Sequence, residues 1–146
     1  MRALPCSTLT IVLAVILAFT ALGCAPSRDA QCKSIIQIAN GAVEEAKKLT
    51  NGGQTNEPQA MLQAADAMEQ AAEGMKALEL TDEQLQTYQS GFIEMYAQTA
   101  EATRNFVDAF EKKDRPRAEA ALANLQRATQ PEQELVQGIN TYCQGN

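Results

Sequence analysis

The stretch DEQLQTYQSGFIEMYAQTAEATRNFVDAFEK, residues 82–112, decides the fold of this chain. Residues that suit a buried seam recur in it every three or four positions, at Leu85, Tyr88, Phe92, Met95, Thr99, Ala102 and Phe106. This spacing places the seam along one face of an α-helix. Thr81 and Gln84 have the spacing of a capping box at its start. The stretch therefore predicts one long helix, from about Asp82 to Lys112.

Helical spacing continues on both sides of this stretch. Residues 30–49 and a segment that begins near Asn56 or Glu57 precede it, separated by the loop Thr50–Gly53, and Asp114 caps a further helix after it. The expected seams are Cys32, Ile35, Ala39, Ala42, Ala46 and Leu49, then Met61, Ala65, Met68, Ala72 and Met75, and finally Ala118, Leu122, Leu125, Val136, Ile139 and Cys143. Four amphipathic helices with short connections predict an all-α fold, an antiparallel up-down-up-down four-helix bundle over residues 32–146.

Pro131 interrupts the fourth of these helices. A proline in a helix interior removes one backbone hydrogen bond and clashes with the preceding turn, which costs about 3 kcal/mol. The helix is therefore expected either to kink at Pro131 or to stop and restart there, with Thr129 and Glu132 as a second capping box.

Cys32 and Cys143 lie at the start of the first expected helix and at the end of the fourth. In an up-down-up-down bundle these two positions fall at the same end, and both cysteines belong to inward seams. The sequence therefore predicts a disulfide between them, which an oxidising compartment would allow.

The N-terminal 23 residues have the composition of a secretory signal. Arg2 is followed by an almost wholly apolar run, Leu9–Leu22, that is too short for a membrane-spanning helix. The sequence Thr20-Ala21-Leu22-Gly23-Cys24 then resembles the lipobox of bacterial lipoproteins. The alternatives are an ordinary signal peptide and a short uncleaved anchor.

The lipobox resemblance implies that cleavage after Gly23 leaves Cys24 as a lipidated N-terminus. Residues 1–23 are then the signal peptide, residues 24–31 a short tether and residues 32–146 the bundle domain. Two or three acyl chains would hold the protein at a membrane, since a single chain binds only marginally. Ala25 is not the aspartate that suggests inner-membrane retention in enteric-type bacteria. The outer membrane is therefore favoured, with an inner or thylakoid membrane as alternatives and the domain in the periplasm or lumen.

The composition excludes several classes of function. Without residues 1–23 the chain keeps 11 basic and 18 acidic residues, a formal charge of −7, which disfavours nucleic acid as a partner. The chain has no histidine, the commonest metal ligand and general base. Met61, Met68 and Met75 recur every seven residues, about 10 Å apart along a helix, which is too far to share one ion. No enzyme activity, metal or cofactor is expected, and most carboxylates are assigned to a solvated surface.

A difference in helix length indicates where a partner would bind. The expected third helix is longer than the first, so the hairpin of the third and fourth helices should extend beyond the first pair by ten or more ångströms. This distal tip, Phe106–Arg117, combines an apolar cluster that includes Phe106 and Phe110 with the densest cationic run of the chain: Lys112, Lys113, Arg115 and Arg117. In the alternative interpretation, the 50–57 loop covers the aromatic residues and the charges only keep a turn soluble.

These features predict a membrane-anchored, non-enzymatic accessory module that docks a protein partner through the distal tip. The second hypothesis is a bundle that binds a small ligand or acts as a sensor, with a pocket near Met68, Phe92 and Met95. In overall plan the chain resembles small helical lipoproteins of cyanobacteria, including those that accompany photosystem II assembly. That resemblance rests on architecture, and so it implies little about function.

Overall fold

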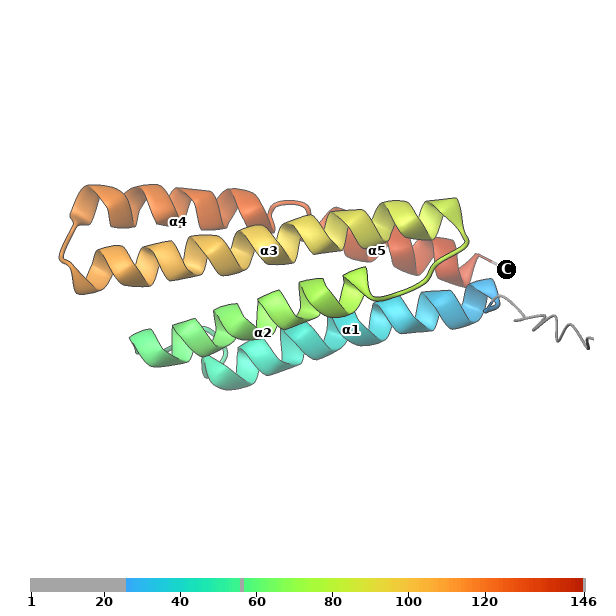
Figure 1. The fold of residues 1–146 in the computed structure, drawn as a ribbon, viewed down its shortest axis with the longest axis horizontal. Helices are drawn as coiled ribbons and strands as arrows, with labels where there is room; N and C mark the ends of the chain where they lie inside the picture. Colours follow the sequence, from blue (N-terminus) through green and yellow to red (C-terminus); the bar gives the residue numbers. More distant parts are fainter. Residues whose placement is uncertain (1–25, 56, 146) are drawn as a thin grey trace, which may run out of the picture.

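Helices account for nearly all of the chain that the structure describes. The structure is a computed structural model and describes residues 26–55 and 57–145. The helices are α1 (Arg28–Leu49), α2 (Pro58–Lys76), α3 (Glu83–Glu111), α4 (Arg115–Thr129) and α5 (Glu132–Gln144), and they pack against one another (Figure 1). No strand occurs in the described residues. The prediction of an all-α helical bundle is confirmed.

Short polar side chains cap the helices near the positions that the sequence indicates. Asp114 accepts a hydrogen bond from the backbone N–H of Arg117, as expected for the start of α4. The predicted cap of α3 is wrong by one residue. Asp82 is the N-cap and accepts from the N–H of Leu85 at 3.0 Å, because the Thr81 hydroxyl is already bonded to the side chain of Gln31.

The segment expected as one fourth helix consists of α4 and α5, with Gln130 and Pro131 between them. The predicted second capping box is wrong. Pro131 is the N-cap residue of α5 and makes no side-chain cap bond, and the Thr129 hydroxyl instead donates back to Leu125 and Gln126 in α4.

The long helix α3 lies at the centre of the arrangement. It packs extensively against both α2 and α4, whereas α1 and α4 hardly meet (Figure 1). Since α4 is covered mainly by α3, the seam predicted for the fourth helix is partly wrong. Leu122 is 44% exposed and Val136 is 39% exposed, and the buried residues of α4 are Ala121 and Ala128.

The core is concentrated toward the end of the molecule that holds the two cysteines, which we call the disulfide end. Its most enclosed large side chains are Ile35, Met75, Leu85 and Phe92. The ring of Tyr96 stacks on Phe92 with centroids 5.9 Å apart. Burial raises the pKa of Tyr96 to about 12, because the phenolate would lose its hydration there.

Two glycines allow α3 and α5 to approach closely. A Cβ atom on Gly91 of α3 would lie 2.6 Å from Cδ2 of Leu135 in α5. A Cβ atom on Gly138 of α5 would lie 2.7 Å from Cε1 of Tyr88 in α3. Each helix therefore places a large side chain over a glycine of the other. This close packing brings α5, the shortest of the five helices, into tight contact with α3.

The predicted cysteine pair is brought together. Cys32 near the start of α1 and Cys143 near the end of α5 form a disulfide, with Cα atoms 6.0 Å apart and a sequence separation of 111 residues. Cys32 belongs to the buried core. The bond therefore connects the first and last helices where both pack on α3.

Gln31 joins the start of α1 to the turn between α2 and α3. Its side chain is 3% exposed. The amide nitrogen donates to the carbonyl oxygen of Pro26 at 2.8 Å and to the Thr81 hydroxyl at 3.0 Å. The amide oxygen accepts from the backbone N–H groups of Thr81 and Asp82. One buried side chain thus satisfies four backbone or hydroxyl groups from two distant segments.

Replacing Gln31 by alanine is expected to lower the free energy of unfolding by about 2 kcal/mol, because part-buried N–H groups lose their acceptor. The matched control is Gln37→Ala, since Gln37 is an exposed glutamine of the same helix and should change stability by less than about 0.5 kcal/mol. Urea denaturation of both variants measures the difference. Equal stability of the two variants would contradict the role assigned to Gln31.

Candidate functional site

An apolar hollow lies beside the distal tip. We call it the tip groove and define it by its lining residues: Gly53, Thr55, Pro58, Met61, Phe106, Val107, Phe110, Leu122 and Leu125. Its volume is about 490 Å³. The end of α3 contributes three of these residues, α4 forms one side, and the start of α2 with the preceding loop forms the other. The groove stays open because neither α1 nor α2 packs extensively against α4.

The two phenylalanines that the sequence singled out lie together in this groove. Their ring centroids are 6.2 Å apart, with the ring planes inclined by 21°. Phe110 is nevertheless 56% exposed, and Leu122 on the opposite side is 44% exposed. Large apolar side chains that gather in this way, rather than singly, are typical of a binding surface.

The loop before α2 borders the groove but does not close it. Gly52 and Gly53 have positive φ values of 69° and 83°, which lets the chain reverse direction after α1. Gly53 and Thr55 then lie along one side of the groove. The interpretation in which this loop covers the aromatic residues is wrong for Phe110, which remains more than half exposed, whereas Phe106 is partly buried in the groove that the loop borders.

The four cations of the distal tip have different surroundings. Lys112 and Arg117 both bind the carboxylate of Asp108, at 2.6 and 3.4 Å. Arg115 pairs with Glu119 at 2.7 Å. Among the described residues, Lys113 has no ion-pair partner, and it occupies a left-handed turn position with φ 58°.

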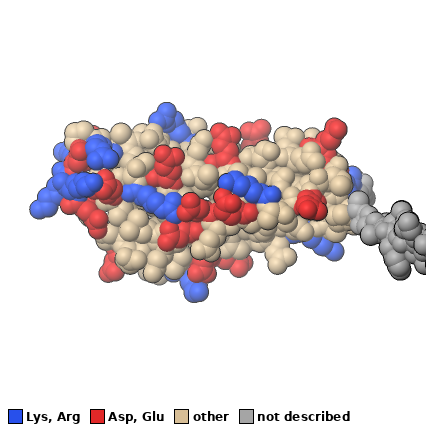
Figure 2. Space-filling model, viewed as in Figure 1, with Lys and Arg blue, Asp and Glu red and all other residues tan. Residues whose placement is uncertain are grey.

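Opposite charges are therefore intermixed at this end of the molecule. Residues 108–119 carry four basic and four acidic side chains. Figure 2 shows blue and red side chains side by side around the tip, whereas red dominates several stretches of the remaining visible face. The tip differs from the acidic remainder by being balanced in charge, which corrects the expectation of a plainly basic patch.

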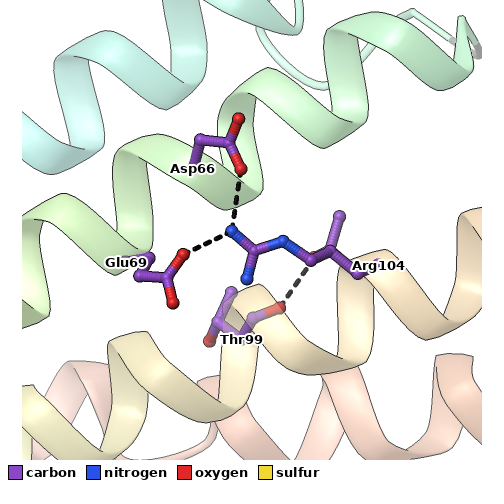
Figure 3. Close-up of polar contacts among 5 residues, drawn as sticks. Asp66, Glu69, Thr99 and Arg104 are labelled. Carbon is purple, nitrogen blue, oxygen red and sulfur yellow. Dashed lines mark hydrogen bonds and ion pairs between the residues drawn. The ribbon is translucent and has the colours of Figure 1, made fainter.

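An ion-pair cluster lies one helical turn from the groove and connects α2 to α3. One guanidinium nitrogen of Arg104 binds Asp66 at 2.7 Å and Glu69 at 2.6 Å (Figure 3). The hydrogen bond that Arg104 donates to the carboxylate of Asp66 raises the pKa of the guanidinium. Such exposed pairs contribute only about 0–1 kcal/mol, so the cluster adds little to the stability of the contact between α2 and α3.

A second hollow follows α5. It is lined by Tyr88, Gln130, Gln133, Glu134, Gln137, Gly138, Thr141 and Tyr142 and has a volume of about 630 Å³. Although it is larger than the tip groove, most of its lining side chains are uncharged polar groups that water solvates well. We therefore place the candidate site at the tip groove, where apolar side chains are left in contact with water.

The other predicted positions are resolved only in part. Cys24, the expected lipidation site, lies outside the described residues. Within the described part of the chain, no helix combines the length and the apolar content needed to cross a membrane. The same residues contain no group of three or more Cys, Asp or Glu side chains placed to hold a metal ion.

Several lining residues of the groove were not expected from the sequence. The spacing of Met61 and Leu122 predicts buried seam positions, and no pattern singles out Pro58 for the groove. Their place in the groove depends on how far α4 diverges from α1, which no local pattern reports. The available signal was the difference in length between α1 and α3. It predicts that the end of the α3–α4 hairpin extends beyond the first two helices and is not covered by them.

Comparison with known proteins adds no relative to this description. The chain matches no family model, no curated protein and no solved structure. The class that the fold and the site define is therefore a disulfide-linked helical bundle with an apolar groove at the end opposite its disulfide.

Proposed function

We propose that this protein is an exported, lipid-anchored accessory protein, without enzymatic activity, that docks a protein partner at the tip groove. The observation that carries the proposal is the exposed apolar surface of Phe110 and Leu122, beside the partly buried Phe106, at one end of the bundle. Association of such a surface with a partner is favourable because it removes apolar area from water.

The position of the proposed anchor supports the choice of this end. Cys24 precedes Arg28, the first residue of α1, by four positions, which span at most about 15 Å. A lipid on Cys24 would thus hold the disulfide end near the membrane, in the periplasm or lumen. In the up-down-up-down order that we propose, with the fourth segment broken at Pro131, the tip groove then faces away from the lipid and is accessible to a partner.

A small-ligand site inside the bundle has less support. Phe92 and Met95, around which such a pocket was expected, are both buried and packed in the core cluster. Opening a pocket there would separate the ring of Phe92 from Tyr96 and lose packing that stabilises the fold. The tip groove needs no such rearrangement.

Site-specific photocrosslinking in the cells of origin tests the proposal. The crosslinking amino acid p-benzoylphenylalanine replaces Leu122 in the groove or, as a control, Gln37 on the exposed face of α1. Crosslinked protein is expected at position 122 and absent at position 37. It should sediment with membranes, and Cys24→Ser should move it to the soluble fraction.

Each part of the proposal can fail separately in this experiment. An absence of any crosslink at position 122 would contradict the docking function. Membrane association that is unchanged by Cys24→Ser would contradict the anchor. Reversing the charge of Lys113 and Arg115 leaves the apolar lining intact and shows whether the tip cations contribute to docking.

A further inference from the structure

The shape of the tip groove fits one kind of occupant. Between the start of α2 on one side and α4 on the other, α3 lines the groove with Phe106 and Phe110, four residues apart, and α4 lines it with Leu122 and Leu125, three residues apart. These are two rows of side chains at helical spacing, on neighbouring helices that pack along their length. A third helix laid between the rows can insert its own side chains among them, as helices do in bundles.

The tip beside the groove is balanced in charge as a whole, but two of its cations, Lys113 and Arg115, are not bound by Asp108. Arg115 precedes Leu122 by seven residues in α4 and so continues that lining row toward the tip, whereas Lys113 lies in the turn after α3, three residues beyond Phe110. Lys112 and Arg117, in contrast, are neutralised by Asp108. Among the described residues Lys113 has no ion-pair partner, and the Arg115–Glu119 pair is weak because the Arg115 side chain is 88% exposed. A negatively charged group is therefore favoured at this end.

We propose that the tip groove binds an amphipathic helix of a partner protein, whose apolar stripe fills the groove and whose end carries carboxylates that bind Lys113 and Arg115. This inference rests on the proposed docking function and names the chemistry of the partner. The negative end of the partner helix dipole would add to the attraction if its C-terminus lies at the tip.

Two other occupants fit the groove less well. An acyl chain would keep one side in water, because the groove is open and Phe110 is more than half exposed. A second copy of this chain would offer α4 as its exposed apolar helix. Both ends of α4 carry arginines, Arg115 and Arg117 at the start and Arg127 at the end, so either orientation would bring further cations to the tip end of the groove.

Peptide binding to the full mature protein in lipid nanodiscs tests the inference. The probe is a fluorescent amphipathic peptide of about 18 residues, long enough to form a helix, with leucines at helical spacing and two glutamates at its C-terminus. The matched peptide has two lysines there. Fluorescence anisotropy is expected to show at least about tenfold tighter binding of the acidic-ended peptide, equivalent to 1.4 kcal/mol. Lysines at a C-terminus stabilise a helix more than glutamates do. A difference in helicity between the two peptides would therefore favour the lysine-ended peptide and does not explain the expected result.

Two protein variants make the test specific to the groove. Leu122→Glu should abolish binding of both peptides, with circular dichroism to confirm that the bundle is folded. The pair Lys113→Glu with Arg115→Glu alters only exposed side chains and should reverse the order of the two peptides. Lack of binding by the acidic-ended peptide, or equal binding of both peptides, would overturn the inference.

The remaining outcomes identify the rival occupants. Saturable binding of a fluorescent fatty acid, lost in Leu122→Glu, would show that the groove binds an acyl chain and would overturn the inference of a helix. A dimer that dissociates in Leu122→Glu would show that the groove binds a second copy of this chain and would likewise overturn the inference. A crosslink at position 122 to a partner without an acidic amphipathic helix would overturn this inference but leave the docking function, whereas no crosslink would remove both.

Discussion

Replacing Cys32 and Cys143 together by serine is expected to lower the free energy of unfolding by about 4–5 kcal/mol, the largest effect that we predict. The bond closes a loop with 111 residues of separation, so it restricts the unfolded chain strongly. The core that remains is rich in alanine, and alanine buries little apolar area per residue. The bond is therefore expected to supply a large share of the 5–15 kcal/mol typical of a domain.

Urea denaturation measures this loss, with wild type under reducing conditions as the second arm. Reduced wild type and the double serine variant should unfold at similar urea concentrations, and reductant should not change the variant. A loss below about 1 kcal/mol would contradict the prediction. Hydrogen exchange should locate the change in α5. Ile139 is the only buried residue of this helix, so α5 depends on the disulfide more than the other helices do.

Helix positions could be predicted from the sequence because their signals are local. Asp114 and Pro116 mark the start of α4 through a cap bond and a fixed φ, and the paired glycines Gly52 and Gly53 mark the reversal after α1. The disulfide could be predicted because it needs only the ends of the chain to lie at the same end of the bundle. Errors in caps arose where a distant residue intervened, as Gln31 does at Thr81.

The exposure of Leu122 could not be predicted in the same way. Its spacing from Ala118 and Leu125 shows that one face of α4 is apolar, but spacing does not report whether another helix covers that face. Coverage depends on the direction that α4 takes away from Pro131. The close approach of Gly91 to Leu135 was missed for the same reason, because it is a contact between distant segments.

The charge of the distal tip shows a related limit. Lys112, Lys113, Arg115 and Arg117 lie close together in sequence and form its densest cationic run. Asp108 lies one turn before them in α3, where it reaches both Lys112 and Arg117. Only the folded hairpin reveals that this carboxylate removes two of the four cations from the patch. The site that remains, Lys113 and Arg115 beside an apolar groove, is smaller and more specific.

Phe92→Ala is expected to lower the free energy of unfolding by about 3–5 kcal/mol, whereas Phe110→Ala should change it by less than about 1 kcal/mol. Both residues lie in α3, and both substitutions remove the same atoms and gain the same helix propensity, so burial is the main difference. Phe92 is 1% exposed and stacks on Tyr96, and its removal leaves a cavity in the core. Phe110 is 56% exposed, so water replaces much of what is lost.

The two variants separate stability from docking when unfolding and peptide binding are measured on the same samples. Phe110→Ala should weaken binding of the acidic-ended peptide by about tenfold or more. The ring is exposed in the free protein, so its apolar surface is buried only when a partner binds. Phe92→Ala, under conditions where it is still folded, should bind the peptide as wild type does. A phenylalanine that can be removed without loss of stability or of binding would mean that the tip groove is an ordinary surface, and the docking function would lose the observation that carries it.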